Sequence, residues 1–284
     1  MEKFSNILGQ TDAVSFLQGI IKSEKYSNAM IFVGPPGVGK GKAAEAFAFA
    51  ASCINGTGCA RCAACKANAY GEGFEEIDIV RLAEEEKNQV KGLRRILGSH
   101  STARQVPRFV VCIKNTDRMN ESMQAAMLKS IEEPPPKVTY VLISSNTYNL
   151  ASTIRSRSVM VRFRPLPHEK IVRILEKEGL CRGGKMTKKQ QEIVSFAEGS
   201  VSRASQLLEQ FDDPAKMEKD FFQLAYQRGK NVRNIVQQQL ELLVPVMAKK
   251  HPEWSKPLVD LDSAINSNAN ISLAFGSFKQ AIQL

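Results

Sequence analysis

The stretch that decides the fold is Ile31-Phe32-Val33-Gly34-Pro35-Pro36-Gly37-Val38-Gly39-Lys40-Gly41. Its apolar start predicts a buried strand, the glycines predict a tight turn, and Lys40 begins an alanine-rich helix. Strand, glycine loop and helix in this order are the context of a phosphate-binding loop. Gly34, Gly37 and Gly39 let backbone N–H groups converge on phosphate oxygens. Lys40 adds a charge for the outer phosphates, so the loop could contact ATP or ADP. Whether a nucleotide binds stays open here, and a plain glycine turn is the alternative.

The metal-binding part of the pattern is missing. A working loop has Ser or Thr after the lysine, because that hydroxyl binds the magnesium of the nucleotide, whereas Gly41 has no side chain. An ATPase of this type also ends a later strand in a magnesium-binding Asp and a water-activating Glu. After the apolar run 109–113, this chain has Lys114 and Asn115 instead, and Asp117 lies beyond the strand. We therefore expect the isolated chain to lack ATPase activity.

The composition is that of an ordinary soluble globular protein. The chain has 284 residues, of which 43% are hydrophobic and 24% charged, and this length suggests two or three domains. No apolar run approaches the roughly 20 residues needed to span a bilayer, and the start lacks a signal-peptide layout. We expect a cytoplasmic protein without membrane contact. The net charge of +10 permits contact with nucleic acid without requiring it.

Four cysteines form a second motif. They follow the pattern C-x5-C-x2-C-x2-C, at Cys53, Cys59, Cys62 and Cys65. In a cytosolic protein such a cluster favours thiolates on a metal ion over disulfides. Four sulfurs about 2.3 Å from zinc satisfy its tetrahedral preference, so a structural zinc site is expected. Four incidental free thiols are the alternative, and the isolated Cys112 and Cys181 are interpreted as structural.

Strand and helix signals alternate along the first part of the chain. Further strands are expected at 76–80, 109–113, 138–144 and 159–163, and helices at 4–25, 40–52, 123–133 and, after a loop, within 82–97. This alternation predicts an α/β fold with a parallel five-stranded sheet and helices on both faces. Later signals are helical, at 167–180, 188–196, 203–211 and throughout 215–284. We expect domain boundaries near 164/165 and, at Asp212-Asp213-Pro214, near 211/212.

Several short motifs together resemble one family. They are Gly9-Gln10, the phosphate loop, the four-cysteine insertion after its helix, Thr116-Asp117-Arg118-Met119, Leu128-Lys129-Ser130-Ile131-Glu132-Glu133-Pro134-Pro135 and Thr153-Ile154-Arg155-Ser156-Arg157-Ser158. Residues 1–210 thereby resemble the bacterial DNA polymerase III clamp-loader subunits of the AAA+ superfamily, and 266–274 is similar to the last helix of their collar domain. The resemblance implies an AAA+ domain at 1–164, containing the zinc module 53–65, a helical lid at 165–211 and a helical collar at 212–284.

The resemblance also implies a function. The family forms a hetero-oligomeric ring of gamma/tau and delta subunits within the DNA polymerase III holoenzyme, a DNA-directed DNA polymerase (nucleotidyltransferase), and it loads the sliding clamp onto primed DNA. Gamma/tau subunits are ATPases, whereas delta-prime keeps the fold without the chemistry. The departures at Gly41, Lys114 and Asn115 favour delta-prime.

Two arginines match functional positions of the family. Ser156-Arg157-Ser158 resembles its Ser-Arg-Cys motif with the cysteine exchanged. The resemblance implies that Arg157 reaches the γ-phosphate of a neighbouring subunit's ATP as an arginine finger. A surface ion pair is the alternative. Arg203 lies in a segment similar to the second nucleotide sensor, or it serves only its helix.

Two other functions stay open at this point. One is a working gamma/tau-type ATPase, against which Lys114 and Asn115 argue. The other is a zinc-containing nucleic-acid-binding module with a vestigial phosphate loop, which nothing in the sequence excludes. Direct DNA contact through Arg94, Arg95 and Arg104 is a further hypothesis, although charged runs usually form solvated faces.

Overall fold

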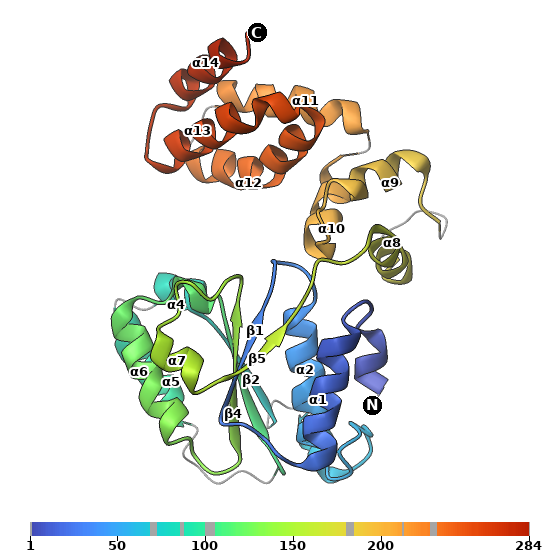
Figure 1. Cartoon of the computed structure of the whole chain (residues 1–284), viewed down its shortest axis with the longest axis vertical. Coiled ribbons are helices and arrows are strands. Elements are labelled where there is room, and N and C mark those ends of the chain that lie inside the picture. Colours follow the sequence, from blue (N-terminus) through green and yellow to red (C-terminus); the bar gives the residue numbers. More distant parts are fainter. Residues whose placement is uncertain are drawn as a thin grey trace. The chain divides into compact units, whose positions relative to one another are not determined.

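The fold is described from a computed structural model of the chain. This structure describes residues 2–68, 73–85, 88–99, 106–179, 185–211, 213–227 and 232–283. The chain divides into two compact units, Met1–Leu166 and Pro167–Leu284 (Figure 1). The division lies two residues from the expected boundary at 164/165.

The first unit is built on a parallel sheet of five strands in the order β2-β3-β4-β1-β5. The strands are β1 (Ala29–Val33), β2 (Phe74–Asp78), β3 (Phe109–Lys114), β4 (Val138–Ser144) and β5 (Val159–Arg162). Every adjacent pair is parallel. The inner strands β1, β3 and β4 are almost wholly buried, which explains their continuous apolar runs. The edge strands β2 and β5 are partly exposed, so their sequences carry charge.

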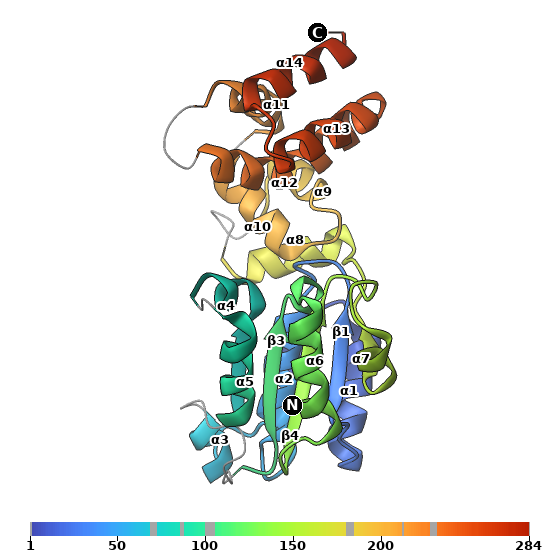
Figure 2. The same ribbon diagram turned by 90° about the vertical axis from the view of Figure 1, so that its left-hand side faces the viewer.

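Helices cover both faces of this sheet (Figures 1 and 2). One face carries η1 (Glu2–Asn6), α1 (Thr11–Ser23) and α2 (Lys40–Ala51), and the other carries α4 (Ile79–Glu85), α5 (Gln89–Ser99), α6 (Glu121–Glu132) and α7 (Ser152–Ser156). Successive residues of a strand point to opposite faces. Phe32 accordingly packs in the cluster beneath α1 and α2, whereas Ile31 packs in the cluster beneath α5 and α6. The predicted α/β sheet with helices on both faces is confirmed.

Several element boundaries differ from the sequence-based prediction. The strand expected at 76–80 ends two residues earlier, because α4 begins at Ile79 directly after it. The helix expected at 4–25 is divided into η1 and α1, and Gly9 between them has a positive φ of 80°. The segment 82–97 holds parts of two helices, α4 and α5. A short helix α3 (Ala63–Asn68) follows the cysteine turns and was not predicted.

The second unit is helical throughout its described residues. Its elements are α8 (His168–Lys177), α9 (Lys188–Ser195), α10 (Val201–Gln210), α11 (Pro214–Gln223), η3 (Leu224–Tyr226), α12 (Val232–Lys250), η4 (Pro252–Trp254), α13 (Ser255–Asn266) and α14 (Ile271–Ala281). The buried Phe221 joins α11 to α14, with ring centroids 5.6 Å from those of Phe275 and Phe278. The division of this unit into lid and collar at 211/212 stays a prediction, and Asp212 lies outside the described residues. Within the described part of the chain, no helix combines the length and apolarity needed to cross a bilayer.

Candidate functional site

The glycine loop joins β1 to α2 and has the backbone form that a phosphate-binding loop requires. Gly37 and Gly39 have φ values of 71° and 97°, which only glycine adopts without strain. Gly39 is also the N-cap of α2. A Cβ on Gly34 would lie 2.2 Å from the carbonyl oxygen of Phe163, so the chain passes here too closely for any side chain. The predicted strand–loop–helix unit is therefore present.

Lys40 lies inside this loop. Its side chain is largely buried, and the residue is only 6% exposed. The Nζ atom donates hydrogen bonds to the carbonyl oxygens of Gly34 and Pro35, the latter at 2.6 Å. Burial lowers the pKa of Lys40 to about 8, against the opposing effect of the Asp117 carboxylate, which raises it. The lysine thus places a titratable cation against the loop backbone, where a bound phosphate would meet it.

The positions that bind magnesium in phosphate-loop ATPases hold other groups here. Lys114 ends β3, and its Cε lies 3.5 Å and its Nζ 3.9 Å from where a Cβ of Gly41 would stand. The same Nζ forms a 2.6 Å ion pair with Oε1 of Glu76 on β2. Asn115 donates from Nδ2 to Oδ1 of Asp78 at 2.8 Å. An ammonium and an amide, each with a carboxylate partner, therefore occupy the place of the acids.

Asp117 is bound to the end of β4. Its Oδ1 accepts a 3.1 Å hydrogen bond from the backbone N–H of Ser145 and a 3.3 Å bond from Oγ of Ser144. These bonds fix η2 (Thr116–Arg118) against the carboxyl edge of the sheet. The negative charge of Asp117 raises the pKa of Lys40, against the larger lowering effect of burial.

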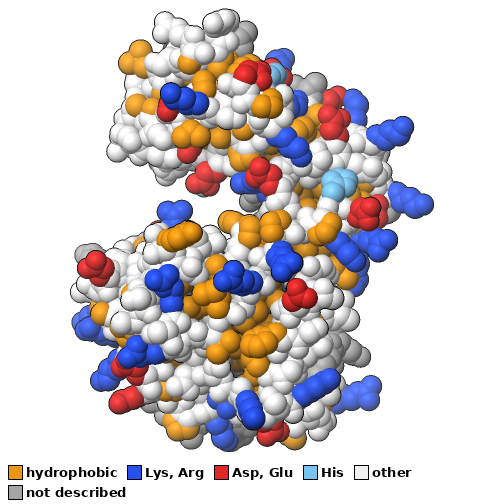
Figure 3. All heavy atoms as spheres, in the orientation of Figure 1, with side chains coloured by type: hydrophobic (Ala, Val, Ile, Leu, Met, Phe, Trp, Pro, Cys, Tyr) orange, Lys and Arg blue, Asp and Glu red, His pale blue; other side chains and the backbone are white. Residues whose placement is uncertain are grey.

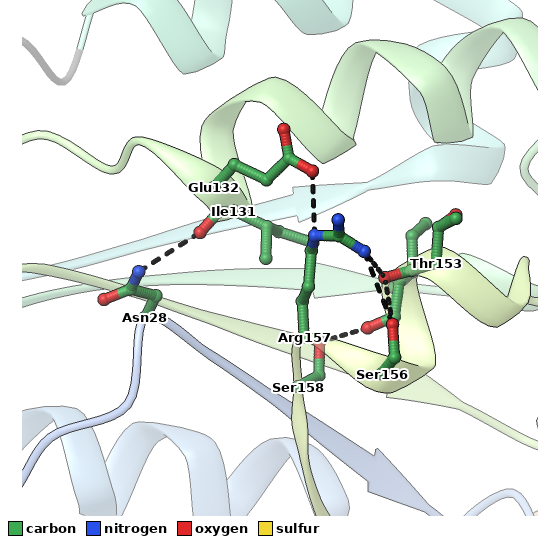
Figure 4. A network of polar contacts seen from close by, with 8 residues as sticks. Asn28, Ile131, Glu132, Thr153, Ser156, Arg157 and Ser158 are labelled. Carbon is green, nitrogen blue, oxygen red and sulfur yellow. Dashed lines mark hydrogen bonds and ion pairs between the residues drawn. The ribbon is translucent and has the colours of Figure 1, made fainter.

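Arg157 follows α7 at the turn into β5 (Figure 4). Its Nε forms a 2.7 Å ion pair with Oε1 of Glu132 at the end of α6. Its Nη1 donates to the carbonyl oxygen of Thr153 at 3.3 Å and to Oγ of Ser156 at 3.4 Å. The arginine and glutamate side chains are 44% and 47% exposed. The surface ion pair that was the alternative for Arg157 is therefore present, and only its partner, Glu132, was missed from the sequence.

Gln124 on α6 was also missed from the sequence. Its Nε2 donates to the carbonyl oxygens of Met119 at 3.1 Å and Asn149 at 2.8 Å, and its Oε1 accepts from the N–H of Ala151 at 2.7 Å. The side chain is largely buried, so these bonds face little competition from water. Gln124 therefore ties the chain that leaves β3 to the segment preceding α7 and Arg157.

The four cysteines meet as their spacing predicts. Their sulfur atoms all lie within 4.8 Å of one another. The pairs Cys53–Cys59, Cys53–Cys62 and Cys59–Cys65 are 3.7, 3.9 and 4.0 Å apart. Four sulfurs placed tetrahedrally about 2.3 Å from a zinc ion would be about 3.8 Å apart. The donor set therefore fits a tetrahedral metal ion, and these four residues could hold one.

The backbone around the cysteines supports thiolates. The N–H of Cys62 points to Sγ of Cys59 at 3.4 Å, and the N–H of Cys65 points to Sγ of Cys62 at 3.3 Å. Burial raises the pKa of Cys53, but backbone N–H groups outweigh it and bring the pKa down. Burial, together with hydrogen bonds to Cys62 and Cys53, raises the pKa of Cys65. Metals bind the thiolate form, so the shift at Cys53 favours coordination. Burial instead raises the pKa of Cys112 in the sheet, as expected of a structural thiol, and Cys181 lies outside the described residues.

The remaining candidate arginines lie apart from these clusters. Arg203, in the second unit, forms a 2.9 Å ion pair with Glu198, and its N–H binds the N-cap hydroxyl of Ser200. Its contact with a nucleotide stays a prediction. Arg94 and Arg95 are exposed on α5, and Arg104 lies outside the described residues. Figure 3 shows Lys and Arg side chains spread over one face of the molecule among apolar and acidic ones. This view does not show a single basic stripe.

The chain was compared with known proteins. A family model described as "DNA polymerase III, delta subunit" matches residues 9–167. The DNA polymerase III subunit tau of Bacillus subtilis is 28% identical over 213 residues, covering 74% of this chain and 38% of the relative. Subunit tau of Escherichia coli is 26% identical over 214 residues, covering 74% and 33%. The chain thus spans between 33% and 38% of the length of these relatives.

Solved structures share the fold. A DNA polymerase III gamma subunit-related protein from Thermotoga maritima aligns with a TM-score of 0.54 and 15% identity, covering 92% of this chain and 96% of that one. A RuvB Holliday junction branch-migration motor from the same organism aligns at 0.52 and 15%, covering 93% and 83%. The helical second unit is included in both alignments, whereas the family model covers the first unit. From the family match and its relatives it follows that the chain belongs to the bacterial DNA polymerase III clamp-loader family of AAA+ proteins.

Proposed function

We propose that this chain is a delta-prime-like subunit of the clamp loader, which has lost ATP hydrolysis and supplies Arg157 to the ATP site of an adjacent gamma/tau subunit. The observation that carries the first half is the geometry beside Gly41. The ammonium of Lys114 and the amide of Asn115 stand where an ATPase needs a metal ligand and a water-activating base, and both are held by acids of β2.

The second half rests on the place of Arg157. A guanidinium stays charged at any physiological pH and can donate two parallel hydrogen bonds to phosphate oxygens. Arg157 is partly exposed on a turn, and its partner Glu132 is exposed as well, so the contact can be exchanged for another anion without unfolding any element. Such an arginine can stabilise the charge that develops as a γ-phosphate leaves.

The proposed assembly explains the other features. In a ring with gamma/tau and delta subunits, the chain would take part in loading the sliding clamp onto primed DNA in the cytoplasm, with its own DNA contacts secondary. Zinc at Cys53, Cys59, Cys62 and Cys65 would be structural, since four protein ligands leave no open coordination position for chemistry. A nucleotide would then be bound without hydrolysis, through Gly34, Gly37, Gly39 and Lys40.

The test is the substitution Arg157→Ala in the reconstituted clamp loader. We expect the complex to assemble, because the side chain is partly exposed, but DNA-stimulated ATP hydrolysis and clamp loading to fall. An arginine finger contributes roughly 10³ to 10⁵ in rate at its own site, so the complex would lose the share from that site. Arg157→Lys should rescue little, because an ammonium lacks the planar fork. Arg155→Ala, two residues earlier in the last turn of α7, is the matched control. Normal rates with Arg157→Ala would leave only a scaffold role.

A gamma/tau-type ATPase is the competing function, because tau subunits are among the relatives of this chain. The two proposals differ in the isolated chain. A delta-prime-like subunit shows no hydrolysis above background, and Lys40→Ala changes nothing catalytic. Single-turnover hydrolysis that disappears with Lys40→Ala would establish the ATPase instead.

A further inference from the structure

The side chain of Lys114 ends close to position 41, where a working phosphate-loop protein has the hydroxyl that binds its metal ion. Magnesium binds oxygen at about 2.0–2.1 Å, so a metal on a hydroxyl of residue 41 would lie within roughly 3.5 Å of the Cβ of that residue. Nζ of Lys114 lies 3.9 Å from the Cβ position of Gly41. The ammonium is thus at a comparable distance from the same backbone position.

The contacts of Lys114 leave its charge available at the loop. The side chain is 33% exposed, and it pairs with Glu76, which is 42% exposed. An ion pair this open to water is weak, so the ammonium can exchange a carboxylate oxygen for a phosphate oxygen. Lys40 supplies a second cation, from inside the loop. Together, Lys40 and Lys114 put two positive charges beside the N-terminus of α2, where backbone N–H groups favour anions.

We propose that the Lys114 ammonium replaces magnesium, so that the loop binds the phosphates of a nucleoside di- or triphosphate without a divalent metal. This inference deepens the proposed function, because it rests on the loss of metal chemistry at the same loop. It also explains why position 41 is a glycine. A Cβ there would touch Cε of Lys114 at 3.5 Å, and the further atoms of a threonine would compete with the ammonium for the space.

The experiment measures binding of fluorescent ADP and ATP to the full chain, once with excess magnesium and once with EDTA. We expect dissociation constants that agree within about twofold between the two conditions. Unlabelled pyrophosphate and ADP serve as competitors, because equal competition by pyrophosphate would assign binding to the phosphate chain alone. The clamp loader's other subunits are absent, so the result does not depend on Arg157.

The variants separate the lysine from the fold. Lys114→Met/Glu76→Gln removes both charges of the pair, and we expect it to raise the dissociation constant in EDTA at least about tenfold, the value of one hydrogen bond to a charged group. Glu76→Gln alone frees the ammonium and should lower the constant. Lys129→Met, an exposed lysine on α6, is the control and should change neither value. A thermal unfolding transition, measured for each variant, tests whether that variant is folded.

Three results would overturn the inference: binding that requires magnesium, no binding in either condition, or an unchanged dissociation constant in the double variant. If the double variant fails to fold, the single variant Glu76→Gln tests the inference instead. Weaker or unchanged binding of the nucleotide by Glu76→Gln would contradict a role for Lys114. Failure here leaves the arginine-finger proposal standing. That proposal fails separately, when Arg157→Ala leaves ATP hydrolysis of the assembled complex unchanged.

Discussion

The ion pair between Arg157 and Glu132 gives a quantitative prediction for the substitution Glu132→Gln. Both side chains are nearly half exposed, at 44% and 47%. Pairs of this kind contribute about 0–1 kcal/mol, because water screens the charges and two long side chains must be ordered. Withdrawing Arg157 from Glu132 therefore costs at most about 1 kcal/mol, a factor of about five in the population of the free arginine.

From this magnitude we expect Glu132→Gln to leave the chain folded and to raise hydrolysis at the adjacent ATP site by no more than about fivefold. Arg157→Ala should lower the rate at that site by roughly 10³ or more. The assay is steady-state ATP hydrolysis by the reconstituted clamp loader with clamp and primed DNA. The double variant should behave as Arg157→Ala alone, since the carboxylate acts only through the arginine.

Glu133→Gln is the matched control, because this neighbouring glutamate is also exposed, whereas the ion pair of Arg157 is with Glu132. A loss of activity with Glu132→Gln as deep as that with Arg157→Ala would refute the reasoning. The carboxylate would then be needed to aim the arginine, and the pair would function as a unit. Independent, multiplicative effects of the two substitutions would contradict the shared route as well.

Three further predictions follow from the structure. Elemental analysis of the purified chain should find one equivalent of zinc, and metal-free wild-type protein would contradict this. The variant Cys62→Ser should lose the zinc and become sensitive to protease, whereas Cys112→Ala should keep the zinc. The pKa of Lys40 is lowered from 10.5 to about 8 in the folded chain. Between pH 8 and pH 10.5 the unfolded chain therefore binds more protons than the folded chain, and the free energy of unfolding should rise with pH in this range. Denaturant unfolding at pH 8 and 10 should show that rise in wild type and lose it in Lys40→Met. Phe221→Ala should destabilise the second unit by about 3–5 kcal/mol in the same assay, because the ring is fully buried.

The inner strands could be predicted from sequence because burial on both faces leaves only apolar residues. β4 has the predicted bounds, Val138–Ser144, and β3 extends the predicted run by one residue to Lys114. β2 was misplaced because an edge strand needs no such run, and its sequence is Phe-Glu-Glu-Ile-Asp. No glycine or proline separates it from α4, so the sequence gives no signal for the boundary.

The parts of the candidate site also differ in how far the sequence predicts them. The cysteine cluster could be predicted, because its four ligands lie within 13 consecutive residues and local turns alone bring them together. The contacts of Arg157 with Glu132 and of Lys114 with Glu76 join segments that are distant in the chain. Their partners depend on how α6 packs beside α7 and how β2 pairs with β3, which a residue pattern does not specify.

The pairing of β2 with β3 also bears on the proposed loss of metal chemistry. Asp78 stands in register with Lys114, and Glu76 with Cys112, so two acids of the edge strand face the end of β3. They neutralise Lys114 and bind Asn115. An aspartate placed at position 114 alone would instead stand opposite Asp78 in register, and like charges directly opposite each other on paired strands are destabilising. Because the replacement of the acids is matched by partners on a second strand, reverting one residue would not rebuild a magnesium site.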